Sequence, residues 1–274
     1  MTPHRIAILM PGDMGHGVGR ALRAHGHEVI TCLYGRSART RGLAAAAGLR
    51  DAGSLEAVAA AMAATGARPT YVDCNAVSPT TAQAVGEVIA AAGAPFIDCG
   101  IIGWAPGKGA KPTRFHVSGP DTRPMEALDG KGIKVLPMGP EIGRASALKM
   151  AYAGLTKGTM ALHTTMLLAA HQLGIWDELI AEYEDSQQAA LAAMRSRVPR
   201  IPADAGRWTG EMEEIAATLA SVDATPGFHD GVAETFRVLA RTPFAAETRE
   251  TMDMDRTIDE AIPVFARHLK DGDS

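Results

Sequence analysis

The sequence of 274 residues lacks the features that would assign it to several special classes of protein. No apolar run approaches the ~18 residues that a membrane-spanning helix requires. The first apolar run begins at Ile6 and breaks at Pro11 and Gly12, which is too short for the core of a signal peptide. The formal net charge of -4 offers no basic field to a nucleic-acid backbone. We therefore expect a cytoplasmic protein with neither a nucleic acid nor a membrane as its partner.

Cysteine and histidine are present without the spacing of a redox or metal site. Cys32, Cys74 and Cys99 form no CxxC pair, and each lies in an apolar, strand-like run. We expect buried free thiols at all three positions. The nine histidines show no HExxH or similar ligand spacing, so we expect no metal site.

The first half of the chain alternates short apolar runs with alanine-rich helical segments. Apolar residues make up 46% and charged residues 21% of the chain, as in a packed globular protein. Alternation of strands and helices is typical of a doubly wound parallel sheet. The expected strands are 5–10, 27–34, 69–76, 94–102, 113–119 and 132–139, and the expected helices are 15–25, 38–48 and 78–93.

The pattern changes after Gly139. A long apolar segment without proline extends from Gly143 to Leu173 and predicts one helix, and every later segment also reads as helical. We therefore predict an α/β domain over residues 1–140 and an all-α domain over residues 141–274.

The segment "RIAILMPGDMGHGVGRAL" has the outline of a phosphate-binding strand, turn and helix. Gly12 and Gly15 occupy the second and third glycine positions of G-x-G-x-x-G. Met10 occupies the first, where Pro11 can set the turn instead through its fixed φ. The loop Gly12, Asp13, Met14 and Gly15 is therefore predicted to bind a dinucleotide, with a tight turn that binds nothing as the alternative.

The end of the second expected strand favours NADP over NAD. A free 2′-hydroxyl usually meets an acidic residue here, whereas a 2′-phosphate calls for arginine and hydroxyl groups. This chain reads "GRSARTR" without an acid, and Arg36, Ser37 and Arg39 are predicted to hold the phosphate. The alternative is a solvated basic helix start.

Six segments in order resemble the β-hydroxyacid dehydrogenase superfamily, which includes phosphogluconate and hydroxyisobutyrate dehydrogenases and imine reductases. These segments are "MPGDMG", "GRSARTR", "YVDCNAVSP", "FIDCGIIG", "RFHVSGP" and "EIGRASALKMAYAGLTKG" followed by "GEMEEIAATL". The resemblance covers nearly the whole chain, and its nearest branch is the phosphogluconate dehydrogenase-like oxidoreductases. It implies an N-terminal NAD(P)-binding Rossmann domain, a long interdomain helix and a helical domain that forms a homodimer.

The resemblance also implies a catalytic lysine. The lysine of the family follows a glycine-rich helix start, and Lys149 after Gly143 matches it. A lysine here can give a proton to a carbonyl oxygen as hydride arrives, and take it back in the oxidative direction. A surface lysine is the alternative, but the flanking residues are almost wholly apolar. Lys157 is expected to be a snorkelling or phosphate-side group. Asn75 is expected near the nicotinamide ribose.

Two departures affect the predicted substrate side. Relatives that act on small hydroxy acids carry an asparagine where this chain has Ala153, and a serine where it has Ile102. The pocket should therefore prefer a larger or less polar small molecule. The strand end from Asp98 to Gly103 is expected to line this side, and the far wall is expected from the helical domain. The predicted substrate residues are Gly100, Ile102, Gly103 and Trp104, with Trp208, Glu211 and Met212 on the far wall. Ordinary helix packing is the alternative for the last three residues.

A third departure concerns the sheet itself. Relatives have a further strand of the form "DVVLSIVPP", whereas this chain passes from Ser54 into one alanine-rich helix that ends near Gly66. The neighbours of a missing central strand would expose unpaired edges. Either the sheet pairs around a shorter core, or the sequence lacks a segment.

These patterns together predict an NADP-dependent oxidoreductase that acts on a carbonyl or secondary alcohol. Two alternatives stay open. One is an imine reductase, because apolar pockets suit that reaction. The other is a protein that binds the cofactor without turnover, because a central strand is missing.

Overall fold

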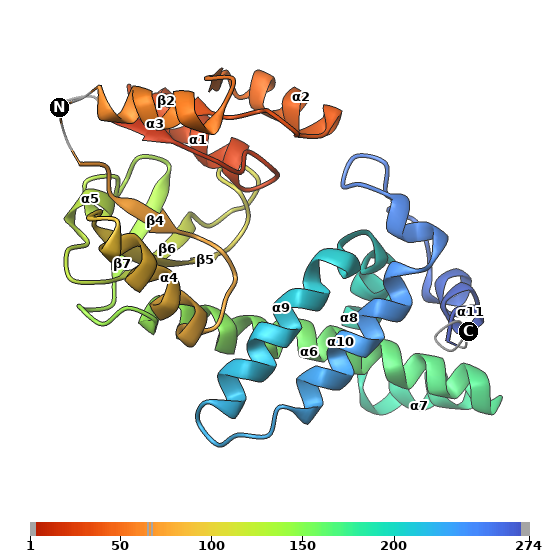
Figure 1. The fold of residues 1–274 in the computed structure, drawn as a ribbon. Coiled ribbons are helices and arrows are strands. Elements are labelled where there is room, and N and C mark those ends of the chain that lie inside the picture. The colour runs from red at the N-terminus through yellow and green to blue at the C-terminus, as the bar shows by residue number, and fades with distance from the viewer. Residues whose placement is uncertain (1–3, 65, 67, 270–274) are drawn as a thin grey trace. The chain divides into compact units, whose positions relative to one another are not determined.

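A computed structural model describes residues 4–64, 66 and 68–269 of the chain, which forms two compact units. The first unit is Met1–Lys149 and the second is Met150–Ser274. Figure 1 shows strands and helices in the first unit and helices in the second. The helix that carries Lys149, α6 (Arg144–Leu173), begins in the first unit and ends in the second. The predicted boundary at residue 140 lies just before this helix.

The first unit has the predicted alternation of strands and helices. Every expected strand is present in a shorter form, and each expected helix lies within one or two residues of its predicted bounds. The strands are β1 (Arg5–Ala7), β2 (Glu28–Thr31), β3 (Arg50–Asp51), β4 (Tyr71–Asp73), β5 (Phe96–Ile102), β6 (Thr113–Ser118) and β7 (Ile133–Pro137). The helices are α1 (Gly15–Ala24), α2 (Ala38–Ala46), α3 (Leu55–Ala63), α4 (Pro79–Ala91) and the short α5 (Arg123–Glu126).

The strands form two sheets. Sheet A has the order β1-β2-β3 and is parallel throughout, and sheet B has the order β4-β5-β6-β7. The strands pair in parallel as predicted except at one pair, because β5 and β6 run antiparallel. The connection between them, residues 103–112, contains no helix. A parallel pair needs a longer crossover, usually helical, and so these strands pair in opposite directions.

The division into two sheets lies where the sequence lacks its strand. Among the described residues, no strand stands between Asp51 and Tyr71. β1 pairs only with β2, and β4 pairs only with β5, so the sheet has not closed around the gap. The alternative of a sheet that pairs around a shorter core is therefore wrong, and the fold is a Rossmann-type fold with an interrupted sheet.

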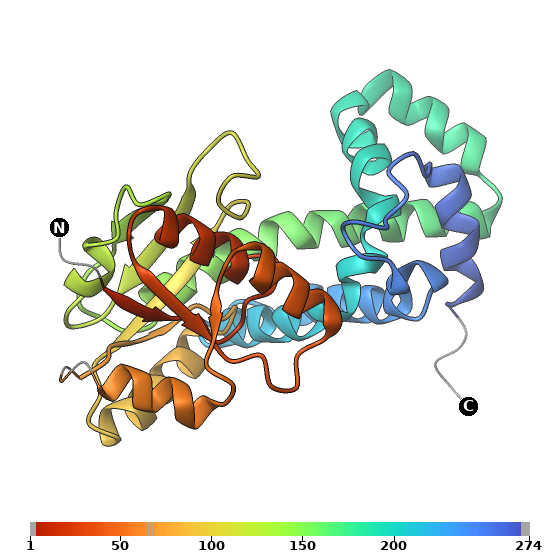
Figure 2. The same ribbon diagram turned by 90° about the horizontal axis from the view of Figure 1, so that it is seen from above.

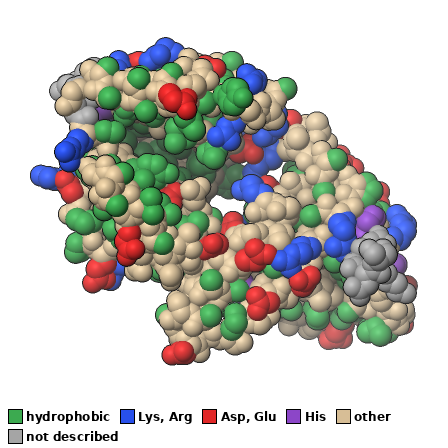
Figure 3. Space-filling view, viewed as in Figure 1, with side chains coloured by type: hydrophobic (Ala, Val, Ile, Leu, Met, Phe, Trp, Pro, Cys, Tyr) green, Lys and Arg blue, Asp and Glu red, His purple; other side chains and the backbone are tan. Residues whose placement is uncertain are grey.

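One hydrophobic core nevertheless joins the two sheets. Val18 and Leu22 of α1 belong to the same buried cluster as Val29 of β2 and as Ile97 and Val135 of sheet B. A second, smaller cluster lies between α3 and sheet A; it contains Ile30, Cys32 and Val58. Hydrophobic side chains also gather in the hollow that the first unit shows in Figure 3. Packing of α1 against residues of both sheets therefore maintains the first unit without a continuous ladder of backbone hydrogen bonds.

The second unit is helical throughout its described residues, as predicted. Helix α6 has 30 residues and is visible as one continuous green helix in Figure 2. The remaining α-helices are α7 (Trp176–Ser186), α8 (Gln188–Arg197), α9 (Pro202–Ala220), α10 (Gly227–Ala240) and α11 (Ile258–Arg267). No helix of the described chain is long and apolar enough to cross a membrane.

Candidate functional site

The turn between β1 and α1 leaves open space around its first glycine. A Cβ atom at Gly12 would meet no heavy atom within 4 Å, so a ligand can approach this backbone. At Gly15 a Cβ would lie 2.1 Å from the carbonyl oxygen of Met10, which permits only glycine. No side chain caps the N-terminus of α1, and its first turn contains no acidic residue. The turn therefore has the form of an anion site at a helix N-terminus.

His16 fixes this turn, and the sequence pattern did not single it out. Its side chain is 6% exposed, and its ring Nδ1 lies 2.7 Å from the carbonyl oxygen of Gly12. The backbone N–H of His16 donates to the same oxygen. Both contacts orient the Gly12 peptide unit. The available signal in the sequence was the spacing of four residues between Gly12 and His16 at the start of a helix. A histidine at this position belongs to no general motif, so the pattern did not indicate its role.

Two predicted phosphate-binding arginines extend to this turn from the segment after β2. Arg39 forms an ion pair with Asp13, with 2.7 Å between Nη2 and Oδ1. Arg36 donates from Nη2 to the carbonyl oxygen of Leu9 at 3.2 Å. The Nε atom of Arg36 is buried and has no hydrogen-bond partner among the described residues. The structure therefore brings together Asp13, Arg36 and Arg39 of the predicted cofactor residues.

Ser37 shapes the beginning of the next helix. It is the N-cap of α2, and its hydroxyl accepts a hydrogen bond from the N–H of Thr40. The first turn of α2 contains no acidic residue. Ser37 thus has an ordinary capping role. The same helix start, flanked by Arg36 and Arg39, is electrostatically suited to a phosphate.

Asn75 follows the end of β4 and turns toward its own strand. Its backbone N–H and its side-chain amide both donate to Oδ1 of Asp73, which is buried. No described contact links Asn75 to the glycine turn, so its place beside a nicotinamide stays a prediction. The neighbouring Cys74 is exposed, whereas Cys32 and Cys99 are buried. The expectation of three buried thiols is wrong at Cys74, because β4 ends one residue earlier and the chain leaves the core.

Asp98 has a different role from the predicted one. It is 1% exposed and caps the N-terminus of α6 instead of lining a substrate surface. Its carboxylate accepts hydrogen bonds from the N–H of Gly143 at 2.9 Å, from the N–H of Ser146 at 3.0 Å and from the Ser146 hydroxyl at 2.6 Å. The Ser118 hydroxyl also donates to it and accepts from the N–H of Ala145. A negative charge at a helix N-terminus is stabilising, so this network anchors α6 on sheet B.

Gly100 allows β5 and α6 to pack closely. A Cβ at Gly100 would lie 2.6 Å from the carbonyl oxygen of Ala145 and 2.9 Å from the Cβ of Lys149. The predicted substrate residue is thus a point of close approach between strand and helix. It places Lys149 directly against the middle of β5. Lys149 is half-buried, and it forms no hydrogen bond or ion pair with a described residue.

The remaining predicted residues of the β5 end differ in exposure. Ile102 is 4% exposed and belongs to the interior of the first unit. Gly103 has a φ of +119°, which favours glycine, and begins the loop 103–112. Trp104 is 61% exposed and its carbonyl oxygen accepts a hydrogen bond from the Thr113 hydroxyl. Of these residues, Trp104 offers the largest surface to a ligand.

The residues predicted for a far wall form a cluster inside the second unit. Lys157 forms a close ion pair with Glu211, and their side chains are 12% and 9% exposed. The Lys157 ammonium also lies 4.9 Å from the centre of the Trp208 ring. The snorkelling or phosphate-side role expected for Lys157 is therefore replaced by a buried ion pair. Met212 is fully buried, so its side chain has no surface for a small molecule in this structure.

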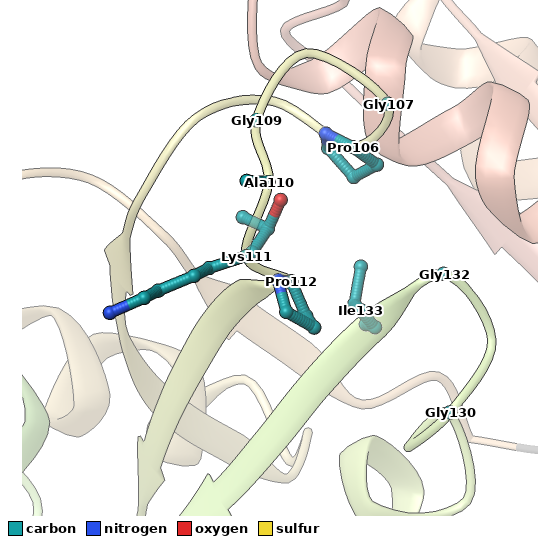
Figure 4. A pocket seen from close by; sticks show the side chains of 10 residues that line it. Pro106, Gly107, Gly109, Ala110, Lys111, Pro112, Gly130, Gly132 and Ile133 are labelled. Atoms are coloured by element: carbon teal, nitrogen blue, oxygen red, sulfur yellow. The ribbon is translucent and has the colours of Figure 1, made fainter.

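A surface cavity of the first unit lies beside Trp104, because its lining residue Thr113 donates to the Trp104 carbonyl oxygen. It has a volume of about 340 Å³ and is bordered by the loop after Trp104 and by the turn before β7 (Figure 4). None of its lining residues is a predicted site residue, and Figure 4 shows the Lys111 side chain extending away from Ile133. The lining residues are Pro106, Gly107, Gly109, Ala110, Lys111, Pro112, Thr113, Gly130, Gly132 and Ile133. Within the described chain, no three His, Cys, Asp or Glu side chains are placed to hold a metal ion.

Comparison with known proteins supports this architecture. Residues 170–239 match the model of a domain of unknown function, DUF1932. An uncharacterized 28.5 kDa protein from the 7S RNA 5′ region of Methanothermus fervidus is 29% identical over 178 residues, which are 58% of this chain and 68% of that protein.

Solved structures match over more of the chain. A conserved protein described as structurally similar to 3-hydroxyacid dehydrogenases is 29% identical, with a TM-score of 0.60 over 86% of this chain and 96% of that one. The 3-hydroxyisobutyrate dehydrogenase of Mycobacterium tuberculosis is 18% identical, with a TM-score of 0.60 over 98% of this chain and all of that one, and so shares the fold.

Proposed function

We propose that this chain, which is 29% identical to a protein described as structurally similar to 3-hydroxyacid dehydrogenases, is an NADP-dependent oxidoreductase that acts on a carbonyl or secondary alcohol. The observation that carries the proposal is that two arginines reach the segment around the glycine turn, Arg36 at the carbonyl oxygen of Leu9 and Arg39 at Asp13. A turn that binds nothing accounts for the Arg39–Asp13 ion pair, but it leaves the second guanidinium group, that of Arg36, beside an open helix N-terminus, where cations are unfavourable.

The residues present fit a dinucleotide phosphate. Open space at Gly12 is the condition for a pyrophosphate close to the backbone, and the uncapped start of α1 supplies N–H groups to it. Arg36 brings a guanidinium group whose Nε lacks a partner among the described residues. Arg39 already shares its charge with Asp13, so Arg36 is the stronger candidate for the 2′-phosphate. Met14 and Ser37 would contribute to cofactor binding through their backbone, because they stand at the N-cap positions of α1 and α2.

Lys149 is proposed as the general acid and base. The bound cofactor would supply or accept hydride at its nicotinamide ring. Lys149 would give its proton to the substrate oxygen during reduction and would recover one during oxidation. The Asp98 network holds the helix start from which this side chain projects, and the absence of a described partner leaves its ammonium group available.

The substrate is proposed to be a small molecule larger or less polar than a short hydroxy acid. Trp104 and Gly103 stand at the exposed end of β5, and Ile102, where relatives carry a serine, brings no polar group to this strand end. The same apolar character is compatible with reduction of an imine, which we retain as the enzymatic alternative. A homodimer through the helical unit is part of the proposal and rests on the family resemblance alone.

The interrupted sheet favours a second candidate, binding of the cofactor without turnover. In the described chain, no strand fills the place in the sheet between the free edge of β1 and the free edge of β4. The nicotinamide side of a Rossmann site is therefore left with fewer supporting residues. This candidate requires affinity for NADPH but no effect of Lys149 on any reaction.

A titration with NADPH and NADH, followed by nicotinamide fluorescence, tests the proposal. We expect the protein to prefer NADPH, and Arg36→Ala to weaken NADPH binding by about 10-fold or more with little effect on NADH, because a charge-assisted phosphate contact is lost. Arg50→Ala is the matched control, since Arg50 is an exposed arginine of the same sheet that pairs with Glu28. Absence of binding by both cofactors would overturn the proposal.

A further inference from the structure

Two cysteines lie side by side where β4 and β5 run parallel. The register pairs Asp73 of β4 with Asp98 of β5. The next residue on each chain is a cysteine, Cys74 and Cys99. Neighbouring strands are about 4.8 Å apart. A disulfide joins Cα atoms about 4.4 to 6.8 Å apart, so adjacent in-register cysteines are within bonding reach.

The alternation of side chains places both thiols on the same face. The rings of Tyr71 and Phe96, which are paired in register, stack at 6.1 Å on one face of the sheet. The next pair, Val72 and Ile97, contacts the core cluster on the other face. Cys99 stands two residues after Ile97 within β5 and points to this second face. Cys74 follows directly after the end of β4, where continued alternation would direct its side chain to the same face. Cys99 belongs to the same core cluster.

The two cysteines differ in access. Cys99 is fully buried, and Cys74 is exposed. A hydrogen bond with Cys74 is the first cause that raises the pKa of the Cys99 thiol, followed by burial and by the charges of Cys74 and the nearby aspartates. Cys99 therefore keeps its proton, and the Cys74 sulfur is the one that can meet an oxidant from solution.

We propose that Cys74 and Cys99 form an oxidation-sensitive dithiol, which a hydroperoxide converts to a disulfide between the two strands. The Cys74 thiolate attacks the terminal peroxide oxygen, the O–O bond breaks, and Cys74 becomes a sulfenic acid while the leaving oxygen takes up a proton from water and departs as an alcohol, or as water when the oxidant is hydrogen peroxide. The Cys99 sulfur then attacks the Cys74 sulfur. The S–S bond forms as the S–O bond breaks, and the Cys99 proton leaves with the hydroxyl group as water. The two thiols are oxidised by two electrons in total and the peroxide is reduced.

Cys32 provides an internal control for this chemistry. It is 4% exposed and its thiol lies 3.9 Å from the carbonyl oxygen of Gly53. It belongs to the separate cluster with Ile30 and Val58, away from the one that contains Cys99. We therefore expect Cys32 to remain a free thiol under conditions that oxidise the pair.

The test treats the folded protein with hydrogen peroxide, blocks remaining thiols after unfolding, and cleaves the chain after glutamate. Cleavage after Glu87 separates Cys74 from Cys99, so their peptides stay joined only through a disulfide. We expect a linked pair of peptides 57–87 and 88–126, lighter by two hydrogen atoms than their sum, with Cys32 blocked as a free thiol. A thiol reductant should release the two peptides.

Two variants separate the proposal from general oxidation. Cys32→Ser should retain the linked peptides, and Cys99→Ser should lose them and instead accumulate sulfenic acid at Cys74, detectable with dimedone. The proposal is overturned if the native protein forms higher oxides at Cys74 without the link, if Cys32 joins either cysteine, or if all three thiols are blocked after treatment. None of these outcomes depends on whether the protein binds NADPH.

Discussion

The turn after β1 and the middle of β5 are built in opposite ways. At the turn, Gly12 faces open space, and the charged groups that reach it, Arg36 and Arg39, come from exposed segments. In β5, Asp98 is buried, and both of its oxygens accept hydrogen bonds from the start of α6. An open helix start can bind an external anion, whereas a capped helix start can only position the rest of its helix. The contrast assigns ligand binding to α1 and positioning to α6.

The largest effect on stability is expected when the cap of α6, the Asp98 carboxylate, is removed. Asp98→Ala removes the common acceptor of two backbone N–H groups and two hydroxyl groups in a buried place. We expect the free energy of unfolding to fall by about 3 to 5 kcal/mol, measured by urea denaturation. Asp121→Ala is the control, because Asp121 pairs with Arg123 at the surface, and it should change stability by less than about 0.5 kcal/mol. Equal losses in both variants would contradict the positioning role.

The next largest effect is expected on catalysis, at Lys149 of helix α6. Lys149→Met should lower kcat by about 10²- to 10⁴-fold with any substrate that the protein turns over, because the proton donor is lost. The measurement is steady-state kinetics with NADPH, with the dissociation constant of NADPH as a second readout that should stay within about 2-fold. Lys134→Met is the control, since Lys134 pairs with Asp129 away from the site. Unchanged kcat in Lys149→Met would favour the candidate that binds without turnover.

Two glycines, Gly12 and Gly15, test whether the turn at the N-terminus of α1 is open to a ligand. Gly15→Ala places a Cβ against the carbonyl of Met10 and should cost about 1 to 3 kcal/mol of stability. Gly12→Ala meets no protein atom, so its stability should change by less than about 0.5 kcal/mol, while NADPH binding weakens by about 10-fold because the methyl group occupies the ligand's space. Denaturation and cofactor titration on both variants check this. A Gly12→Ala protein that binds NADPH normally would show that no phosphate approaches the turn.

The smallest effect is a pH dependence of stability that arises from His27, the residue just before β2. Burial, followed by the charges of His4, Lys131 and His25, lowers the pKa of His27 below its ordinary value of 6.5. As pH falls below about 6.5 the unfolded chain takes up a proton that the folded chain resists, so stability declines until the pH reaches the folded pKa.

Denaturation at several pH values checks this effect. His27→Asn should remove a loss of less than about 1 kcal/mol between pH 7 and pH 5.5. Asn can still accept the hydrogen bond that the N–H of His4 donates to His27. His171→Asn, at an exposed histidine of the second unit whose charge does not act on His27, should leave the pH profile unchanged. A pH profile in His27→Asn identical to that of the natural chain would contradict this assignment.

The order of elements could be predicted from the sequence because it rests on local periodicity. Ser54 and Ser78 cap helices, Gly48 and Gly93 end them with positive φ, and these signals are independent of the rest of the chain. The glycine turn and the arginine segment were recognisable for the same reason.

The role of Asp98 and the direction of β6 could not be predicted in this way. Asp98 depends on Ser146, which lies 48 residues further along the chain, and no local pattern shows that the two meet. An apolar strand reads alike in both directions, so the antiparallel pairing of β5 and β6 has no periodic signal. The exposure of Cys74 depends on where β4 ends, and strand ends are set by pairing more than by composition.

The split between the two sheets has a consequence for how the first unit opens. Backbone hydrogen bonds are directional and stop at the free edges of β1 and β4, whereas apolar contacts are not directional and continue through α1. Amide hydrogen exchange should therefore divide this unit into two cooperative groups, one for each sheet, with the amides of α1 among the slowest to exchange. Where the ladder of strands is interrupted, the apolar contacts of α1 join the two sheets in place of a strand.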